Sequence, residues 1–165
     1  MEQVALFEEK IGLTPRDMNK IGTEEINDIL MGHLRESIEG RCSSHGYVIP
    51  KSLELISRTI GHLDNGRYTG NVIYQIQAQG KVYNPSNGIE IVSDIKKKNK
   101  MGLYLIYEDA IRILVPRDLH LGNEEFENLQ VGETIRVEIR KSRFQIKDSF
   151  ILSVGIYKGK NASNE

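Results

Sequence analysis

Short strand-like segments between residues 84 and 156 constrain the fold of this chain more than any other feature of its sequence. The region opens with the turn signal Asn84–Gly88, and a further turn follows at Glu108–Asp109. Five segments rich in apolar residues are separated by such turns and polar stretches: 89–92, 103–107, 111–115, 135–139 and 150–156. Five short strands with these intervals favour a closed Greek-key barrel of the OB type.

The last two segments show a two-residue period most clearly. Ile135, Val137 and Ile139 alternate with charged residues, which is typical of a strand with one buried face. The final apolar set has the same spacing and consists of Phe150, Leu152, Val154 and Ile156. Both segments are therefore expected to form half-buried strands.

The first half of the chain has a mixed pattern that predicts an α+β domain. After an opening strand at 4–7, Thr14 and Pro15 predict a helix N-cap and the first helical residue. Apolar residues from Ile26 to Ile38 have the spacing of one helix face. Further strand-like segments lie at 47–49, 53–56 and 72–78. The expected fold class is an α+β N-terminal tip domain (strand, helices, antiparallel meander) followed by an all-β five-stranded OB-type barrel.

The expected domain boundaries are 1–83 for the first domain, 84–158 for the barrel and 159–165 for a polar tail. The chain has 165 residues and a net charge of −1, so nucleic-acid binding would require local cationic patches. Residues 1–84 hold nine Lys and Arg against eleven Asp and Glu, whereas residues 85–165 hold thirteen against twelve. The small positive excess falls in the barrel half.

Cys42 is the only cysteine, which excludes an intrachain disulfide and favours an intracellular, reducing compartment. No apolar run has membrane-spanning length, and Met1–Lys10 lacks the apolar core of a signal peptide. Cys42 and His45 have the spacing of half a zinc site, but a closed zinc site needs four ligands. Cys42 is instead expected to be a small buried hydrophobe. We expect no metal, no cofactor and no membrane association.

Motifs for catalysis are missing from the sequence. It contains no phosphate-binding glycine loop, no nucleophile elbow and no paired histidines of a metalloprotease. Glu124, Glu125 and Glu127 follow Asn123, and this order predicts the first turn of a short helix rather than an acid/base pair. The sequence therefore predicts a binding protein and not an enzyme.

A cationic run beside an aromatic residue predicts a nucleic-acid-binding surface on the barrel. If Leu103 and Leu105 point inward, Tyr104 points outward, next to an expected loop that carries four lysines. Stacking on aromatics beside cations is a common way to hold single strands. A solvated lysine loop and an ordinary strand aromatic are the alternative interpretations. The candidate RNA-binding residues are Lys96, Lys97, Lys98, Lys100, Tyr104, Arg112, Arg117, Arg140 and Arg143.

Several short runs along roughly 150 residues occur in an order that resembles a known family. They are Ile38–Cys42 before Gly46–Val48, then Gly66-Arg67, Gly70, Val72–Tyr74, Asn84–Gly88, Met101-Gly102 and Ser153–Ile156. Together they resemble the seventh-subunit family of eukaryotic RNA polymerase II, which has an archaeal counterpart in the E-prime stalk protein. Two departures suggest a divergent branch, such as a polymerase encoded by a large DNA virus. The region 59–70 lacks the proline usual in the family's tip loop, and the loop at 119–131 is shorter.

The resemblance implies a non-catalytic stalk subunit of a DNA-directed RNA polymerase. Its N-terminal domain would dock on the large subunits of the polymerase core, and its barrel would contact nascent single-stranded RNA during transcription. Whether a second stalk protein takes part is left open. The implied location is the nucleus in a eukaryote, the cytoplasm in an archaeon, and the host cell and virion for a virus. The implied docking residues are Tyr47, Gly61, Gly66, Arg67 and Gly70.

Two alternatives belong to different functional classes. A free-standing OB-fold RNA-binding protein, acting in translation or RNA decay, would share only the barrel. A subunit of an RNA-processing enzyme would need a catalytic site, and the sequence offers no motif for one.

Overall fold

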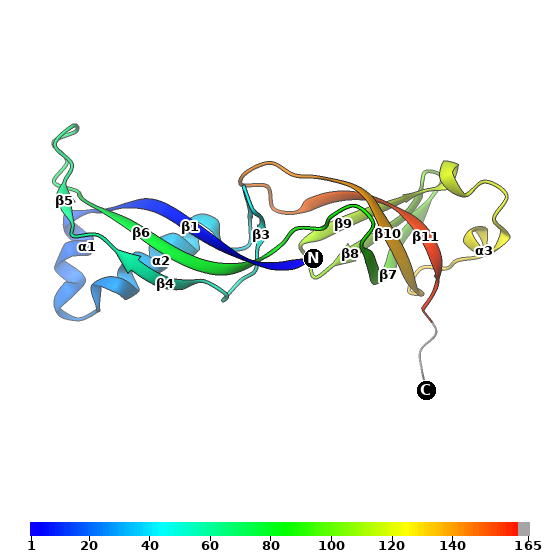
Figure 1. Cartoon of the computed structure of the whole chain (residues 1–165), viewed down its shortest axis with the longest axis horizontal. Helices are drawn as coiled ribbons and strands as arrows, with labels where there is room; N and C mark the ends of the chain where they lie inside the picture. The colour runs from blue at the N-terminus through cyan, green and yellow to red at the C-terminus, as the bar shows by residue number, and fades with distance from the viewer. Residues whose placement is uncertain (162–165) are drawn as a thin grey trace. The chain divides into compact units, whose positions relative to one another are not determined.

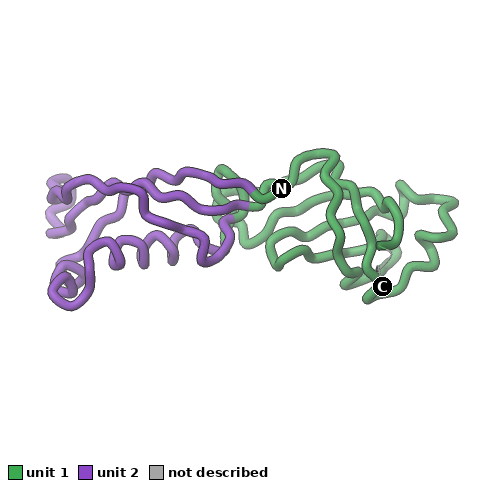
Figure 2. Tube along the Cα trace, turned by 60° about the horizontal axis from the view of Figure 1, so that its bottom comes forward, with its two compact units in different colours: residues 1–2, 41–47, 83–165 green, residues 3–40, 48–82 purple. Residues whose placement is uncertain are grey.

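The computed structural model describes residues 1–161, which form a mostly β structure with few helices and two compact units (Figures 1 and 2). Unit 1 comprises Met1–Glu2, Arg41–Tyr47 and the chain from Tyr83 onward, and unit 2 comprises Gln3–Gly40 and Val48–Val82. These units differ from the contiguous ranges 1–83 and 84–158 because the chain enters unit 1 three times. Residues 162–165 of the expected polar tail lie outside the described residues.

Unit 2 combines helices with β-strands around one core. Its elements are β1 (Glu2–Leu13), α1 (Pro15–Asn19), the 3₁₀ turn η1 (Lys20–Gly22), α2 (Ile26–Ile38), β4 (Glu54–Arg58), β5 (His62–Leu63) and β6 (Val72–Tyr83). β6 pairs with β1 and, in antiparallel fashion, with β4 and β5. The apolar face of α2, including Ile29, Leu30 and Leu34, lies in a core with Phe7 and Ile76. Burial of this face holds α2 against the sheet.

The start of α1 follows the local sequence rules. The Asp17 N–H donates to the Thr14 hydroxyl oxygen at 3.3 Å, and the Thr14 N–H donates to the Asp17 carboxylate at 3.1 Å. Pro15 occupies the first turn, where its missing N–H is not needed. The predicted N-cap is confirmed. The Thr14 hydroxyl also donates to the carboxylate at 2.9 Å, and this bond is the main cause of a lowered pKa for Asp17.

Unit 1 contains a closed barrel of five strands, as the sequence predicted. The strands are β7 (Glu90–Asn99), β8 (Gly102–Tyr107), β9 (Ile111–Pro116), β10 (Thr134–Arg143) and β11 (Ile151–Lys160). They follow the order β10-β11-β9-β8-β7, and β7 pairs with β10 to close the barrel. Neighbours are antiparallel except β9 and β11, which are parallel. This arrangement is an OB-like barrel.

The predicted buried face is right for one of the two most clearly alternating strands, β10, and wrong for the other, β11. On β10, Ile135, Val137 and Ile139 are fully buried, as predicted. On β11 the inward positions are instead Ile151, Ser153, Gly155 and Tyr157, so the apolar set at 152, 154 and 156 lies on the outer face. The reason is steric and polar: a Cβ at Gly155 would lie 2.3 Å from Val137 Cγ1, and Ser153 Oγ is 2.9 Å from Ser142 Oγ. β11 also extends to Lys160, into the segment assigned to the polar tail.

The expected lysine loop is wrong for three of its four lysines. β7 continues through Asn99, so Lys96, Lys97 and Lys98 belong to a strand and only Lys100 lies in the turn. The register shifts between Ile95 and Lys97, which marks a β-bulge at Lys96. A bulge adds one residue, so the alternation of faces shifts by one position after Lys96. Lys97 therefore lies on the face opposite to Ile95, and Lys98 lies on the same face as Ile95, which is the reverse of what simple alternation predicts.

The connection between β9 and β10 contains the 3₁₀ turn η2 (Arg117–His120) and the helix α3 (Glu124–Glu127). Asn123 caps α3 by accepting a bond from the Phe126 N–H at 3.3 Å, which confirms the short acidic helix predicted there. His120 is buried and stacks on Phe126, with 4.4 Å between ring centroids. Its Nδ1 is 2.8 Å from the Pro116 carbonyl oxygen, and its Nε2 accepts from the Tyr157 N–H at 2.9 Å. These contacts fix the connection on the barrel.

A short hairpin that is distant from the barrel strands in sequence lies in unit 1 except for its last residue, Val48, which belongs to unit 2. It is formed by β2 (Cys42–Ser43) and β3 (Gly46–Val48). The Cys42 N–H donates to the Asp148 carbonyl oxygen at 2.7 Å, and the Lys147 N–H donates to the Cys42 carbonyl oxygen at 2.7 Å. Cys42 and Tyr47 are part of the barrel's buried core. The predicted burial of Cys42 is confirmed, and this burial raises the pKa of its thiol to about 11.

Candidate nucleic-acid interface

A row of outward-facing side chains crosses all five strands of the barrel. The strand registers place Lys97 of β7 beside Tyr104 of β8, Tyr104 beside Leu114 of β9, Leu114 beside Val154 of β11, and Val154 beside Lys141 of β10. We call these five residues the central row. Tyr104, Leu114 and Val154 are half-buried, whereas the two terminal lysines are exposed. The central row therefore has an aromatic and aliphatic middle with a cation at each end.

The burial of Leu103 and Leu105 explains why Tyr104 faces outward. Both leucines are in the barrel core with at most 1% of their surface exposed, so the intervening side chain must lie on the opposite face. The predicted direction of Tyr104 is confirmed. Its ring is thus presented beside Lys97 on the same face of the sheet.

A second row runs parallel to the first, one residue pair further along the strands. It places Ile106 beside Arg112, Arg112 beside Leu152, and Leu152 beside Arg143. Leu152 is 54% exposed, and the guanidinium of Arg112 lies over the Phe150 ring, with its Cζ 3.8 Å from the ring centroid. We call Ile106, Arg112, Leu152 and Arg143 the second row.

The terminal cations of both rows are available to an anion. Among the described residues, Lys97, Lys141 and Arg143 form no ion pair with Asp or Glu. All three residues are exposed, so water and dissolved anions can reach their side chains. Such cations can hold phosphates at either end of a stacking surface.

Other candidate cations have contacts elsewhere. Lys98 pairs with buried Leu103, and its Nζ donates to the carbonyl oxygens of Glu127 at 2.6 Å and Leu129 at 2.9 Å. Arg117 Nε lies 2.8 Å from Glu127 Oε1. Both side chains therefore support the connection between β9 and β10.

The remaining candidates fall at irregular positions. Arg140 lies where the β10–β11 register shifts, and its Nη1 is 3.6 Å from Glu138 Oε1. Lys96 is the bulge residue of β7, and Lys100 is exposed in the β7–β8 turn. The structure therefore brings four candidates into the two rows: Lys97, Tyr104, Arg112 and Arg143.

The rows also contain residues that sequence reasoning missed. Val154 and Leu152 were missed because their direction depends on the phase of β11, and Lys141 because it follows a bulge in β10. Leu114 and Ile106 lie beside buried residues of β9 and β8, but as aliphatic residues they gave no signal for nucleic-acid binding. Ser153 and Gly155 carried the usable signal, since small residues at alternate positions suit the tight interior of a narrow barrel.

The predicted docking residues occupy different environments. Tyr47 is only 7% exposed, and its ring stacks with Tyr83 at 6.4 Å between centroids. Gly61 is tightly packed, since a Cβ there would lie 2.5 Å from Tyr74 Cζ. Gly70 has φ +73°, which favours glycine, whereas Gly66 is open and has no left-handed φ. Gly66 and Arg67 lie in the exposed loop after β5, which projects away from α1 and α2 (Figure 1).

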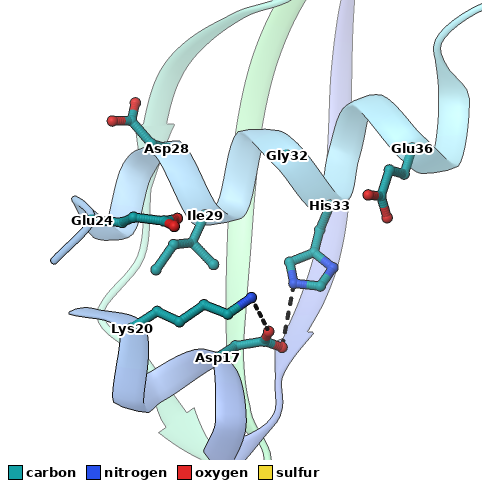
Figure 3. A pocket seen from close by; sticks show the side chains of 8 residues that line it. All are labelled: Asp17, Lys20, Glu24, Asp28, Ile29, Gly32, His33 and Glu36. Atoms are coloured by element: carbon teal, nitrogen blue, oxygen red, sulfur yellow. Dashed lines mark ion pairs between the residues drawn. The ribbon is translucent and has the colours of Figure 1, made fainter. Parts of the chain in front are cut away.

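A polar hollow in unit 2 lies between α2 and the α1–η1 segment (Figure 3). Asp17 of α1 has its Oδ2 3.3 Å from His33 Nε2 and its Oδ1 4.0 Å from Lys20 Nζ. The absence of a side chain at Gly32 leaves the hollow open on the helix side. Lys20 and His33 therefore both face the carboxylate of Asp17 in the same hollow.

Metal and membrane features give no further site. Within residues 1–161, no group of three or more His, Cys, Asp or Glu side chains is placed to hold a metal ion. None of the helices in this part of the chain has the length and apolar character needed to cross a bilayer. The candidate site is the outer face of the barrel, because the strand registers bring the central row and the second row together there. Neither a protein-family model nor a curated protein sequence matches this chain.

Proposed function

We propose that this protein is a non-catalytic, RNA-binding stalk subunit of a DNA-directed RNA polymerase. The central row carries the RNA-binding part of the proposal, because it joins an outward tyrosine to exposed cations on an OB-like barrel. The polymerase part is supported by the resemblance of the residue order to the seventh-subunit family. In this assignment unit 2 docks on the large subunits of the core, and the barrel contacts nascent RNA.

Single-stranded RNA suits the central row for two physical reasons. A base can stack on Tyr104, which typically contributes about 1–3 kcal/mol per base and tolerates any sequence. Phosphates on either side can then approach Lys97 and Lys141, which lie at opposite ends of the row. A duplex buries its bases and could use only the lysines. The surface therefore favours single strands over duplexes.

Filter binding with oligouridylate tests the RNA-binding role. Tyr104→Ala should weaken binding by about 1–3 kcal/mol, because one stacking contact is lost. Tyr68→Ala is the matched control, since Tyr68 is 94% exposed but lies in unit 2. Equal affinity of the wild-type protein and Tyr104→Ala would remove the central row from the binding site.

Co-purification from cells that contain the polymerase tests the stalk assignment. The tagged wild-type protein should recover the large polymerase subunits, whereas Gly70→Val combined with Arg67→Glu should not. Valine is strained at the left-handed φ of Gly70, and the second change reverses an exposed charge in the same loop. Gly22→Val is the control, because a Cβ at Gly22 meets no atom within 4 Å.

The outcome also separates the alternative function. A free-standing RNA-binding protein would bind oligouridylate but would not recover polymerase subunits even as wild type. If the wild-type protein recovers the polymerase and the double variant recovers it equally well, docking through the loop at 61–70 is contradicted.

A further inference from the structure

The contact between Arg112 and Phe150 has no role in the binding site as proposed so far. Arg112 is an exposed residue of β9, and Phe150 is a half-buried residue just before β11. The Cζ of Arg112 is 3.8 Å from the centre of the Phe150 ring, which is van der Waals contact. A cation over an aromatic face is attracted by the ring's electrons, and this attraction holds the long arginine side chain in place.

The position of this pair relative to Tyr104 suggests its function. Tyr104 lies beside Leu114 of β9. Arg112 is two residues before Leu114 on β9, so the two side chains lie on the same face. Diagonal neighbours of this kind are about 7–8 Å apart in an antiparallel sheet. That separation is large enough for two different bases, one over each side chain.

We propose that Arg112, held by Phe150, is a second stacking platform for a base of single-stranded nucleic acid, next to the base stacked on Tyr104. The guanidinium is planar, so one of its faces can lie over Phe150 while the other receives a base. Arg143 lies at the end of the same row, beyond Leu152, and is placed to hold the adjoining phosphate. This inference rests on the proposed RNA-binding function and specifies two adjacent nucleotides within it.

Arg112→Lys gives the sharpest test because it keeps the charge and removes the plane. The probes are an oligouridylate and an oligodeoxyuridylate of about eight nucleotides, within the site size of one OB fold, each with one 2-aminopurine whose fluorescence falls on stacking. Arg112→Lys should weaken binding by about 5-fold to 100-fold and reduce the quenching, while the salt dependence stays unchanged. The matched control is Arg136→Lys, an exposed arginine that lies beside Val92 on the β7–β10 face.

Phe150→Leu is the second variant, since leucine keeps an apolar contact but offers no flat ring. It should produce the same loss of quenching as Arg112→Lys, because the guanidinium is no longer held. The double variant with Tyr104→Ala and Arg112→Lys should multiply the two single losses. A double variant that binds no worse than the weaker single variant would mean that both residues hold one base, which would overturn the proposal.

The remaining outcomes are also decisive. Wild-type affinity and wild-type quenching in Arg112→Lys would overturn the second platform while leaving RNA binding through Tyr104 intact. Failure of the wild-type protein to bind either oligonucleotide would overturn both the platform and the RNA-binding function, whereas polymerase association is read separately by co-purification. Stacking uses only the bases, so Arg112→Lys should weaken the binding of the oligouridylate and of the oligodeoxyuridylate by a similar factor. The oligonucleotide that the wild-type protein binds more tightly shows whether RNA or DNA is preferred.

Discussion

Two outer faces of the same barrel carry many charged residues but differ in how the charges are arranged. On the paired face, which is formed by β10 and the C-terminal part of β11, Glu138 lies 2.9 Å from Lys158 Nζ and 3.6 Å from Arg140 Nη1, and Glu133, just before β10, lies 3.1 Å from Lys160 Nζ. On the face of the central and second rows, the terminal cations have no carboxylate partner among the described residues, and apolar side chains separate them.

The difference suggests a criterion for the proposed binding surface: whether its cations are already paired with carboxylates matters more than how many charges the surface carries. A paired cation already has its electrostatic partner, and an incoming phosphate must compete with it. An unpaired cation beside an aromatic surface loses no ion pair when a phosphate arrives. The net charge of −1 for the whole chain conceals this local contrast.

The largest expected effect comes from breaking the barrel on which both faces depend. Gly102 begins β8 with φ +144°, and a Cβ there would lie 2.1 Å from the Val115 carbonyl oxygen. Gly102→Ala should lower the free energy of unfolding by about 3 kcal/mol or more, measured by urea denaturation, because strain and a backbone clash combine. Gly132→Ala should cost less, since its φ is +97° but its surroundings are open. Equal costs would show that the clash is relieved.

Neutralising the ends of the central row should separate the two faces. The double variant Lys97→Gln and Lys141→Gln should have a weaker salt dependence, because two phosphate contacts are lost. The fall of log affinity for oligouridylate with log salt concentration should become shallower by about 1.4. The matched pair on the other face, Arg140→Gln with Lys158→Gln, should leave the slope unchanged. Equal changes in slope would mean that ion pairing does not distinguish the faces.

Lys98 tests whether a lysine of the same run acts on the fold instead of on RNA. Lys98→Met keeps the aliphatic length but removes both bonds to the carbonyl oxygens of Glu127 and Leu129. We expect a loss of about 1–2 kcal/mol in the free energy of unfolding and little change in RNA affinity. A variant with wild-type stability and a reduced salt slope would assign Lys98 to the binding surface.

The smallest effect concerns the pH dependence of the paired face. The hydrogen bond from Lys158 is the main cause of the lowered pKa of Glu138. A folded pKa below the unfolded value stabilises the protein above the unfolded pKa, which is about 4.3 for Glu, and this contribution is lost as pH falls through the folded pKa. Glu138→Gln should therefore have a lower urea midpoint than wild type at neutral pH, and the difference should disappear in acid. A difference that persists in acid would indicate an effect unrelated to ionisation.

The sequence predicted the barrel because most of its strands carry their own signal. On β10 the inward residues are aliphatic and most of the outward residues are charged, so Ile135, Val137 and Ile139 identify both the strand and its buried face. β11 had the opposite result, since Ser153 and Gly155 point inward for reasons of space and hydrogen bonding that hydropathy does not contain.

The candidate site was only partly predictable for a related reason. Tyr104 could be placed from its buried neighbours, but Lys97, Lys98 and Lys141 depend on bulges that displace the register of β7 and β10. A bulge is decided by how two strands fit, so one strand's sequence does not specify it. The partners of Lys98 lie 29 and 31 residues away in sequence, a separation that local patterns do not cover.

The hairpin of β2 and β3 affects the order in which the chain can fold during synthesis. Cys42 forms two backbone bonds with residues 147 and 148, so the whole intervening chain must be synthesised before those partners exist. At about 5–20 residues per second, this interval lasts on the order of 5–20 s on the ribosome. Contacts so distant in sequence slow folding, because the long intervening loop must close first. β11, the last barrel strand to be synthesised, thus completes a core whose first buried residues, Cys42 and Tyr47, are made early in translation.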